Sequence, residues 1–196
     1  MRFAPGAFKY AALPLLGAVP AFFVTPGGGA LLIAAGVAIL AFFRDPDRTP
    51  PPRGVVSPAD GKVSVLRVEG DRVRVGVFMN VHDVHVNRAP LGGEIEAVDH
   101  EPGGHRPAFS KESDRNERVR VRFADHDVTL IAGAFARRIT PYVEPGETVD
   151  RGDRIGHIAF GSRADVLLPS RFDREDVAVD VGDKVQAGET SIAEQS

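Results

Sequence analysis

The stretch Val119-Arg120-Val121-Arg122-Phe123 alternates apolar and charged residues one by one. Because successive side chains of a strand point to opposite faces, this alternation predicts a β-strand with one face in a core and the other in solvent. Other short apolar runs with strand composition lie on both sides of it: Val55-Val56, Lys62–Val68, Arg72–Phe78, Gly93–Val98, Asp127–Ala132, Ile155–Phe160 and Ala164–Leu168. No long stretch with helical periodicity follows Phe43, so residues 54–196 are predicted to form a mainly β domain.

A short internal repeat lies in the C-terminal part of this region. Gly146–Asp153 (GETVDRGD) and Gly182–Glu189 (GDKVQAGE) share the pattern G-x-x-V-x-x-G-[DE]. Each copy predicts a turn, a short strand and a second turn. This order of elements is typical of barrel-sandwich hybrid folds such as lipoyl and biotinyl carriers. Two ordinary glycine turns are the alternative. We predict a barrel-sandwich-hybrid-like β domain.

The N-terminal region has a different character, because no charged residue lies between Lys9 and Arg44. Thr25–Gly29 divides this stretch into two apolar arms. The second arm, Gly27–Phe43, would span about 25 Å as a helix, slightly less than the ~30 Å hydrocarbon core of a bilayer. The first arm, Phe8–Val24, contains two prolines and is predicted to be the poorer helix.

Both arms are apolar on every face, which favours a membrane-associated hydrophobic hairpin over residues 1–43. Basic residues flank the hairpin on both sides, so both of its ends would face the cytoplasm if it spans the cell membrane. A signal peptide and a hairpin buried in a core are the alternatives. Residues 44–53 then bring charge and four prolines in ten residues, and they are predicted to form a stiff, exposed linker.

Composition excludes several classes of site. The 196 residues contain no cysteine, so the chain holds no disulfide, no thiolate metal site and no thiol nucleophile. The net charge of −3 offers no global basic field, so no nucleic-acid partner is predicted.

Polar residues gather at three places in the β region. Ser162 follows Gly161 in a turn between two apolar runs, where an activated serine and an ordinary turn are both consistent with the sequence. Asp60 precedes Gly61, a pair that usually means only a turn. His85 lies in a dense polar segment and suits acid–base chemistry.

His82 lies three residues before His85, a spacing that suits a turn of helix. A metal site would need a third ligand at convergent spacing, and no such ligand is evident beside Asp83. We therefore predict no metal.

Taken in order, these segments resemble the phosphatidylserine decarboxylase family over essentially the whole chain. The matching segments are FFRDPDR (42–48), VVSPADGKV (55–63), FMNVHDVHVNRAP (78–90), NER (116–118), IAGAFARRI (131–139), FGSRAD (160–165) and V-x-x-G-E-T (185–190). The FGSR motif is similar to the short form of the family, which includes archaetidylserine decarboxylases. The resemblance is compatible with a lipid substrate whose tails are ester-linked or ether-linked.

The resemblance implies a proenzyme that cuts itself between Gly161 and Ser162 into a large chain, 1–161, and a small chain, 162–196. Ser162 would attack the Gly161 carbonyl, and elimination followed by hydrolysis would leave a pyruvoyl group on the small chain. The pyruvoyl group would form a Schiff base with the amine of a serine-headgroup phospholipid and promote loss of CO₂ without metal or pyridoxal phosphate. The resemblance also suggests a homodimer.

Further residues are carried over by position. Asp60 matches the acidic residue associated with self-processing, and His85 the histidine associated with decarboxylation. Arg88 stands where the long form has a second histidine, and arginine is a poor base. The residue that activates Ser162 is therefore left open among His82, His85 and Asp60.

Arg88 is a candidate for contact with the lipid phosphate, as are Arg137 and Arg138. The alternative function is a membrane-anchored biotinyl-like or lipoyl-like carrier or binding module without catalysis. Such a carrier needs a modifiable lysine at a hairpin tip, and the lysines beyond the linker are Lys62, Lys111 and Lys184.

Overall fold

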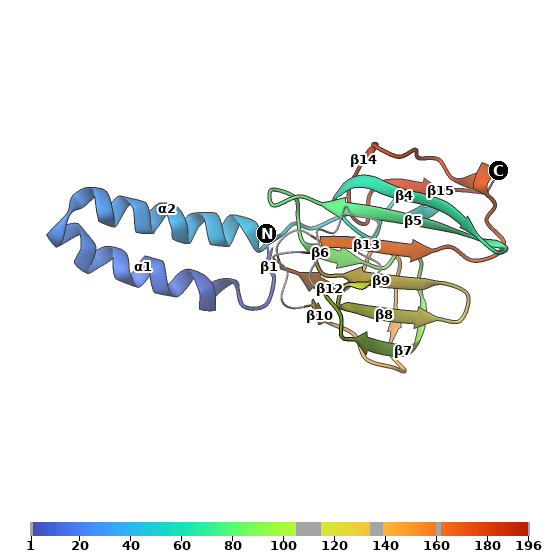
Figure 1. Cartoon of the computed structure of the whole chain (residues 1–196), viewed down its shortest axis with the longest axis horizontal. Coiled ribbons are helices and arrows are strands. Elements are labelled where there is room, and N and C mark those ends of the chain that lie inside the picture. Colours follow the sequence, from blue (N-terminus) through green and yellow to red (C-terminus); the bar gives the residue numbers. More distant parts are fainter. Residues whose placement is uncertain (1, 105–114, 134–138, 160–161, 196) are drawn as a thin grey trace. The chain divides into compact units, whose positions relative to one another are not determined.

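The computed structural model describes residues 2–104, 115–133, 139–159 and 162–195. The chain forms two compact units, Met1–Asp47 and Arg48–Ser196, so the division falls within the proline-rich segment 44–53 (Figure 1). Each unit is described by itself below.

The N-terminal unit is a pair of antiparallel helices, α1 (Ala7–Val24) and α2 (Pro26–Phe42), which confirms the predicted helical hairpin. A short ladder between β1 (Arg2–Phe3) and β2 (Arg44–Asp45) joins the two ends of the hairpin. The backbone N–H of Ala4 extends this ladder by donating to the Phe43 carbonyl at 2.8 Å.

The prediction that the first arm is a poorer helix is wrong, because α1 continues through Pro14 and Pro20. Proline removes a backbone donor and crowds the preceding turn, but it does not prevent packing on the rest of the helix. Here α1 packs closely on α2: a Cβ on Gly36 of α2 would overlap the Leu15 side chain of α1. Close packing through a small residue is typical of helix pairs in apolar surroundings.

Large apolar side chains of the hairpin remain exposed, among them Leu13, Leu16, Phe23 and Leu31. Water-facing residues of this size are unusual in such number on a soluble protein. By length and composition α1 can cross a membrane, and α2 is a shorter apolar helix. These features support association of the hairpin with a membrane.

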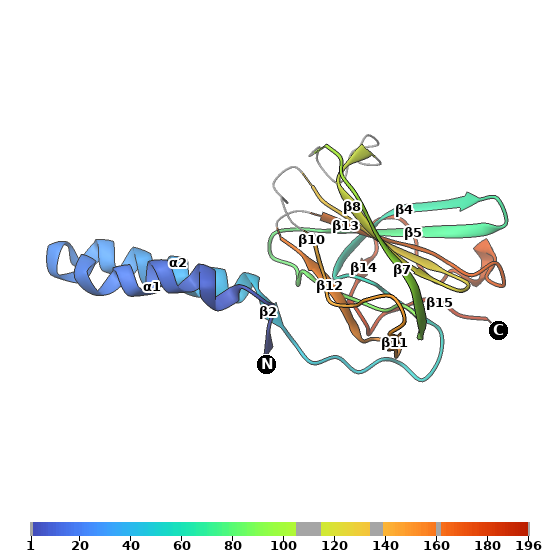
Figure 2. The same ribbon diagram turned by 90° about the horizontal axis from the view of Figure 1, so that it is seen from below.

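The C-terminal unit is built from a curled eight-stranded sheet and two smaller sheets (Figure 2). The large sheet has the order β11-β7-β8-β9-β13-β5-β4-β14. Its strands are β4 (Gly61–Glu69), β5 (Arg72–Met79), β7 (Gly93–Glu101), β8 (Arg118–Phe123), β9 (Asp127–Ile131), β11 (Thr148–Val149), β13 (Ser162–Leu167) and β14 (Lys184–Val185). The smaller sheets are β10-β12-β6 and β15-β3, formed by β3 (Val55–Val56), β6 (Val86–Arg88), β10 (Ile139–Pro141), β12 (Arg154–Ile158) and β15 (Ser191–Ala193).

The side chains that face inward from these sheets form one hydrophobic cluster that runs from Val55 to Ala193. On β8 the alternation works as predicted, since Val119, Val121 and Phe123 are buried while the arginines between them face outward. The mainly β class is thereby confirmed. The 3₁₀ turn η2 (Arg174–Asp176) lies between β13 and β14.

Two local predictions differ from the structure. Ser162 is the first residue of β13 and not part of a turn, because pairing with β5 begins at this residue. His82 and His85 lie in an irregular turn before β6 and not in a turn of helix. Asp83 shapes that turn: its carboxylate accepts from the Asn80 N–H at 2.7 Å and its N–H donates to the Asn80 carbonyl at 3.0 Å.

The sequence repeat is a structural repeat. β11 pairs with the start of β7 at one end of the large sheet, and β14 pairs with the start of β4 at the other. The first glycine of each copy donates to an equivalent partner: Gly146 to the Ile95 carbonyl and Gly182 to the Val63 carbonyl, both at 2.8 Å. The two halves can therefore be compared position by position.

We predict that the hairpin carries the membrane association and that the β unit folds without it. All residues of the hydrophobic cluster lie between Val55 and Ala193, so deletion of residues 1–43 removes none of them. In the full chain, Leu16→Lys with Phe23→Lys should shift the protein from washed membranes to the supernatant, because each lysine places a charge in the apolar surface. Sedimentation with membranes measures the effect.

Val68→Lys is the matched control, since Val68 is an exposed valine of the β unit. It should leave sedimentation unchanged. Full retention of the double variant on membranes would place the anchor elsewhere, and a deletion variant that does not fold would make the hairpin part of the core.

Candidate active site

Ser162 occupies a central position in the β unit. Its strand, β13, lies between β5 and β9 and is paired with both. The residue is fully buried, and its Oγ lies 3.9 Å from the Sδ of Met79, the residue directly opposite on β5. Gly161, the residue predicted to precede the cut, lies outside the described residues.

The Met79 sulfur joins Ser162 to a second polar side chain, Asn87. The Asn87 Nδ2 donates toward Met79 Sδ at 3.7 Å and toward the Pro58 carbonyl at 3.4 Å. Asn87 is fully buried on β6, two residues beyond His85. The sequence analysis missed Met79 and Asn87, although both lie in the quoted segment 78–90.

His85 is buried at the entry to β6, and its ring is oriented by the backbone. Its Nδ1 lies 2.9 Å from the Asp83 carbonyl oxygen. A carbonyl only accepts, so the neutral ring carries its proton on Nδ1 and its lone pair on Nε2. The backbone of His85 also accepts from the Ile158 N–H at 3.3 Å, at the end of the strand that leads toward Ser162.

Asp60 is held on both carboxylate oxygens. Oδ1 accepts from the Ala187 N–H at 2.8 Å, and Oδ2 accepts from Arg48 Nη2 at 2.8 Å. Burial raises the pKa of the Asp60 carboxyl, against the opposing effects of the Ala187 hydrogen bond and the Arg48 charge; Asp83 raises it further. The net effect is a raised pKa, which brings Asp60 closer to the neutral pH range where a carboxyl group can both accept and release a proton.

Arg48 bridges two carboxylates. Besides Asp60, its Nη1 donates to Glu189 Oε2 at 2.6 Å, and this hydrogen bond lowers the pKa of Glu189. The Arg48 side chain is only 8% exposed, so the linker predicted to be exposed has a buried, ion-paired arginine in it. The prolines of the segment predict exposure, but composition gives no information about the carboxylates that pair with Arg48.

The sequence analysis did not single out Arg48 or Glu189. Both nevertheless lie in segments that carry the family resemblance, at the end of FFRDPDR and in V-x-x-G-E-T. The presence of both residues in segments that match the family was the sequence signal that could have pointed to them.

The structural repeat provides an internal control for Asp60. Its equivalent at the start of β7 is Gly92, where a Cβ would lie 3.3 Å from the Arg151 N–H nitrogen, the counterpart of the Ala187 N–H. The same turn therefore closes in the other half without a carboxylate. Asp60 is not required to make the turn, which favours a chemical role for it.

Arg88 is buried on β6, and its Nη1 donates to the Gly152 carbonyl at 2.8 Å. This contact fixes the turn after β11. Arg137 and Arg138 lie outside the described residues.

His82 is placed differently from His85, because 83% of its side chain is exposed. It lines a cleft of about 590 Å³ together with Asp60 and Asp83. Of the two histidines, His85 is the one held in a defined orientation inside the protein.

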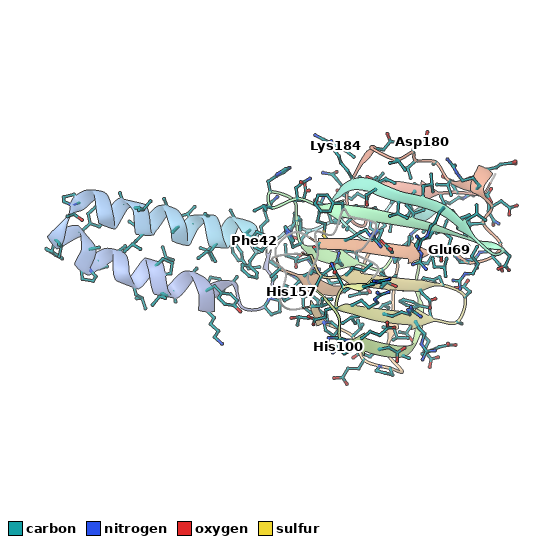
Figure 3. All side chains as sticks on the ribbon, in the orientation of Figure 1. Phe42, Glu69, His100, His157, Asp180 and Lys184 are labelled. Atoms are coloured by element: carbon teal, nitrogen blue, oxygen red, sulfur yellow. The ribbon has the colours of Figure 1, made fainter. Side chains whose placement is uncertain are left out.

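His157 is a further buried histidine that the sequence analysis missed (Figure 3). It lies opposite Val86 in the β12–β6 ladder, and its Nδ1 lies 2.9 Å from the Tyr142 hydroxyl. Burial lowers the pKa of His157, so the ring is neutral at neutral pH.

The contacts connect the segments that carry Asp60, His85 and Ser162. The Pro58 carbonyl, two residues before Asp60, meets Asn87; Asn87 meets Met79; and Met79 meets Ser162. A buried hydroxyl, an imidazole with its lone pair on Nε2 and a carboxyl of raised pKa are the groups that proton-coupled chemistry at a serine requires.

Comparison with known proteins identifies the family of the chain. The model of the phosphatidylserine decarboxylase family matches residues 37–193. A Halobacterium salinarum protein named as an archaetidylserine decarboxylase proenzyme is 60% identical over 190 residues, which cover 96% of this chain and 97% of that protein. A Streptomyces avermitilis protein named as a phosphatidylserine decarboxylase proenzyme is 51% identical over 168 residues, covering 83% of this chain and 76% of that protein. The chain belongs to the phosphatidylserine decarboxylase family, and it is accordingly a carboxy-lyase.

Proposed function

We propose that this chain is the proenzyme of a pyruvoyl-dependent decarboxylase that converts a serine-headgroup phospholipid, phosphatidylserine or its archaeal equivalent, to the ethanolamine phospholipid and CO₂. One observation carries the proposal: Ser162, the family's cleavage serine by resemblance, is fully buried and connected by contacts to the segments of Asp60 and His85. The proenzyme names of relatives over 50% identical support it.

Self-cleavage begins at the Ser162 hydroxyl. Its oxygen attacks the Gly161 carbonyl carbon, its proton leaves to a base, and the peptide C–N bond breaks with protonation of the nitrogen, which gives an ester. Removal of the Ser162 α-proton then expels the Gly161 carboxylate and leaves a dehydroalanine. Addition of one water and loss of one ammonia give the pyruvoyl group on the small chain.

Asp60 is our candidate for the base that activates Ser162. Its carboxyl has a raised pKa, and a carboxyl of that kind is a better base than an ordinary aspartate. His82 is exposed and Arg88 stays charged, so neither offers an oriented, buried base. His85 is oriented, and we assign it to the second reaction.

In decarboxylation the pyruvoyl carbonyl supplies the electron sink, because it condenses with the substrate amine and draws electrons from the bond to the departing carboxylate. After CO₂ has left, the substrate carbon that carried the carboxylate must receive a proton. We propose that His85 Nε2 first takes up a proton and that the resulting imidazolium delivers it to this carbon, since Nδ1 is directed to the Asp83 carbonyl.

The hairpin fits a substrate that remains in the bilayer. We propose that it holds the β unit at the cell membrane on the cytoplasmic side, where serine lipid is met at the interface. The exposed apolar side chains of α1 and α2 support this placement. We also retain the homodimer as a proposal from the family resemblance.

The alternative function, a carrier without catalysis, is less well supported. A carrier presents its modified lysine at a hairpin tip, whereas Lys184 lies within β14 and Lys62 within β4, directly opposite each other. Lys111 lies outside the described residues.

Ser162→Ala should remain a single chain of 196 residues and release no CO₂ from a serine phospholipid, because the nucleophilic oxygen is missing. Electrophoresis under denaturing conditions and a CO₂ assay measure the two effects. Ser64→Ala is the matched control: Ser64 is also a serine at a strand position of the large sheet, and the variant should cleave normally.

Cleavage of Ser162→Ala at the same bond would contradict the serine mechanism. So would a wild-type protein that decarboxylates the lipid while it remains one intact chain.

Arg48→Gln should move the pH dependence of self-cleavage to higher pH. Without the Arg48 charge the ionised form of Asp60 is less favoured, so the pKa of Asp60 rises further. Below that pKa the cleavage rate should fall about tenfold for each unit by which the pKa has risen, and it should recover as the pH increases. Cleavage rates of freshly expressed protein across a pH series measure the shift.

Arg48→Lys keeps a positive charge and should restore most of the profile. Arg122→Gln, which removes an exposed arginine paired with Asp99, is the charge-matched control and should leave the profile unchanged. An Arg48→Gln profile identical to that of the wild type would remove Asp60 from the proton transfer.

A further inference from the structure

We propose that the cleft beside Asp60 binds a phosphate-ester anion through the ammonium groups of Lys62 and Lys184. The identity of that anion as the phosphodiester of the lipid headgroup rests on the function proposed above.

The cleft has a volume of about 590 Å³ and lies between the β4–β14 edge and the turn that precedes β6. Both lysines line it, and both are exposed. Lys184 projects from the rim of the β unit at β14 (Figure 3). The other lining residues are Asp60, Gly61, Asn80, His82, Asp83, Val185, Gln186 and Thr190.

The two lysines are held next to each other by the sheet. Lys184 and Lys62 are direct partners in the antiparallel ladder between β14 and β4. Like charges directly opposite each other on neighbouring strands destabilise the pair. Over the described ranges of the chain, neither ammonium group has a hydrogen-bond or ion-pair partner.

The structural repeat shows that the fold does not need this charge pair. At the equivalent positions in the other half, Thr148 of β11 lies opposite Glu94 of β7. The chain contains only four lysines among its 24 basic residues, and two of them face each other here. The unfavourable lysine pair therefore occurs at the copy of the repeat that packs beside Asp60. An anion bound between the two ammonium groups would offset the repulsion between them.

The acidic residues that face the cleft are already engaged. Asp60 accepts from Arg48 and from the Ala187 N–H, and Asp83 accepts from the Asn80 N–H. Glu189 is paired with Arg48 at the same network. These contacts offset the negative charge that would otherwise repel a phosphate.

The wall of the cleft includes Asp60 and chain neighbours of other residues of the candidate active site. Asn80 of its wall follows Met79, the residue against Ser162, and Asp83 of its wall orients His85. An anion held at the lysines would thus place the rest of its molecule beside the reacting residues. This site differs from the Arg88 site expected from the sequence, since the Arg88 guanidinium is buried and bonded to the Gly152 carbonyl.

The direct test is binding of sn-glycero-3-phosphoserine to the full-length protein in detergent, measured by calorimetry with Lys62→Gln/Lys184→Gln beside the wild type. The double variant should bind the probe about tenfold or more weakly, because it loses two charge-assisted contacts. Lys62→Arg/Lys184→Arg keeps both charges and should retain binding. Arg122→Gln is the control for loss of charge elsewhere and should bind as the wild type does.

A kinetic measurement gives a second readout on mixed micelles of serine phospholipid. The double Gln variant should cleave itself at the normal rate and show a raised KM with little change in kcat, because within the described residues no hydrogen bond or ion pair joins either lysine to Asp60 or Ser162. Equal affinity of the Gln variant and the wild type for the probe would overturn the proposal, as would binding of inorganic phosphate without binding of the phosphodiester.

The binding test is independent of catalysis. In the Ser162→Ala background, loss of probe binding on addition of the two lysine substitutions would support the site even if the proposed pyruvoyl function failed. Unchanged binding in that background would overturn the site even if the wild type cleaves and decarboxylates.

Discussion

The structure depends on the position of β13 in the middle of the large sheet. Ser162–Leu167 is hydrogen-bonded to β5 on one side and to β9 on the other, and Ala164 and Val166 point into the core. A chain interrupted just before Ser162 would keep all of these contacts. Cleavage at this place is therefore compatible with an intact fold.

The C-terminal segment is tied to the rest of the β unit at two further places. β14 pairs with β4, and β15 pairs with β3. These ladders place Ala187 and Glu189 against Asp60 and Arg48, so the carboxylate that we assign to processing is held by groups on both sides of the proposed cut. Under our proposal the small chain helps to assemble the site that produces it.

Much of the fold follows from the sequence because its signals are local. Alternation places β8, and the charge-free stretch indicates the helical hairpin. The failures arise where tertiary contacts outweigh local rules. Packing on α2 carries α1 through Pro14 and Pro20, and Asp83 folds the histidine segment into an irregular turn despite its helical spacing.

The candidate site divides in the same way. Motif order predicts Ser162, Asp60 and His85 as site residues, and the structure connects their segments. Arg48 is missed because a proline-rich segment suggests exposure, whereas its partners, Asp60 and Glu189, come from elements far along the chain. No local pattern reports that Arg88 donates to the Gly152 carbonyl, since the two residues lie 64 positions apart in the sequence.

Mass spectrometry of the purified wild-type protein under native and denaturing conditions tests the central claim most directly. We predict one complex under native conditions and two chains after denaturation: residues 1–161, and the 35 residues that begin at Ser162. Their summed mass should exceed that of the intact chain by one water less one ammonia, the balance expected for a pyruvoyl group. A single chain of 196 residues would contradict the proposal, as would two chains whose summed mass exceeds that of the intact chain by a full water, with a free serine amine at the N-terminus of the small chain.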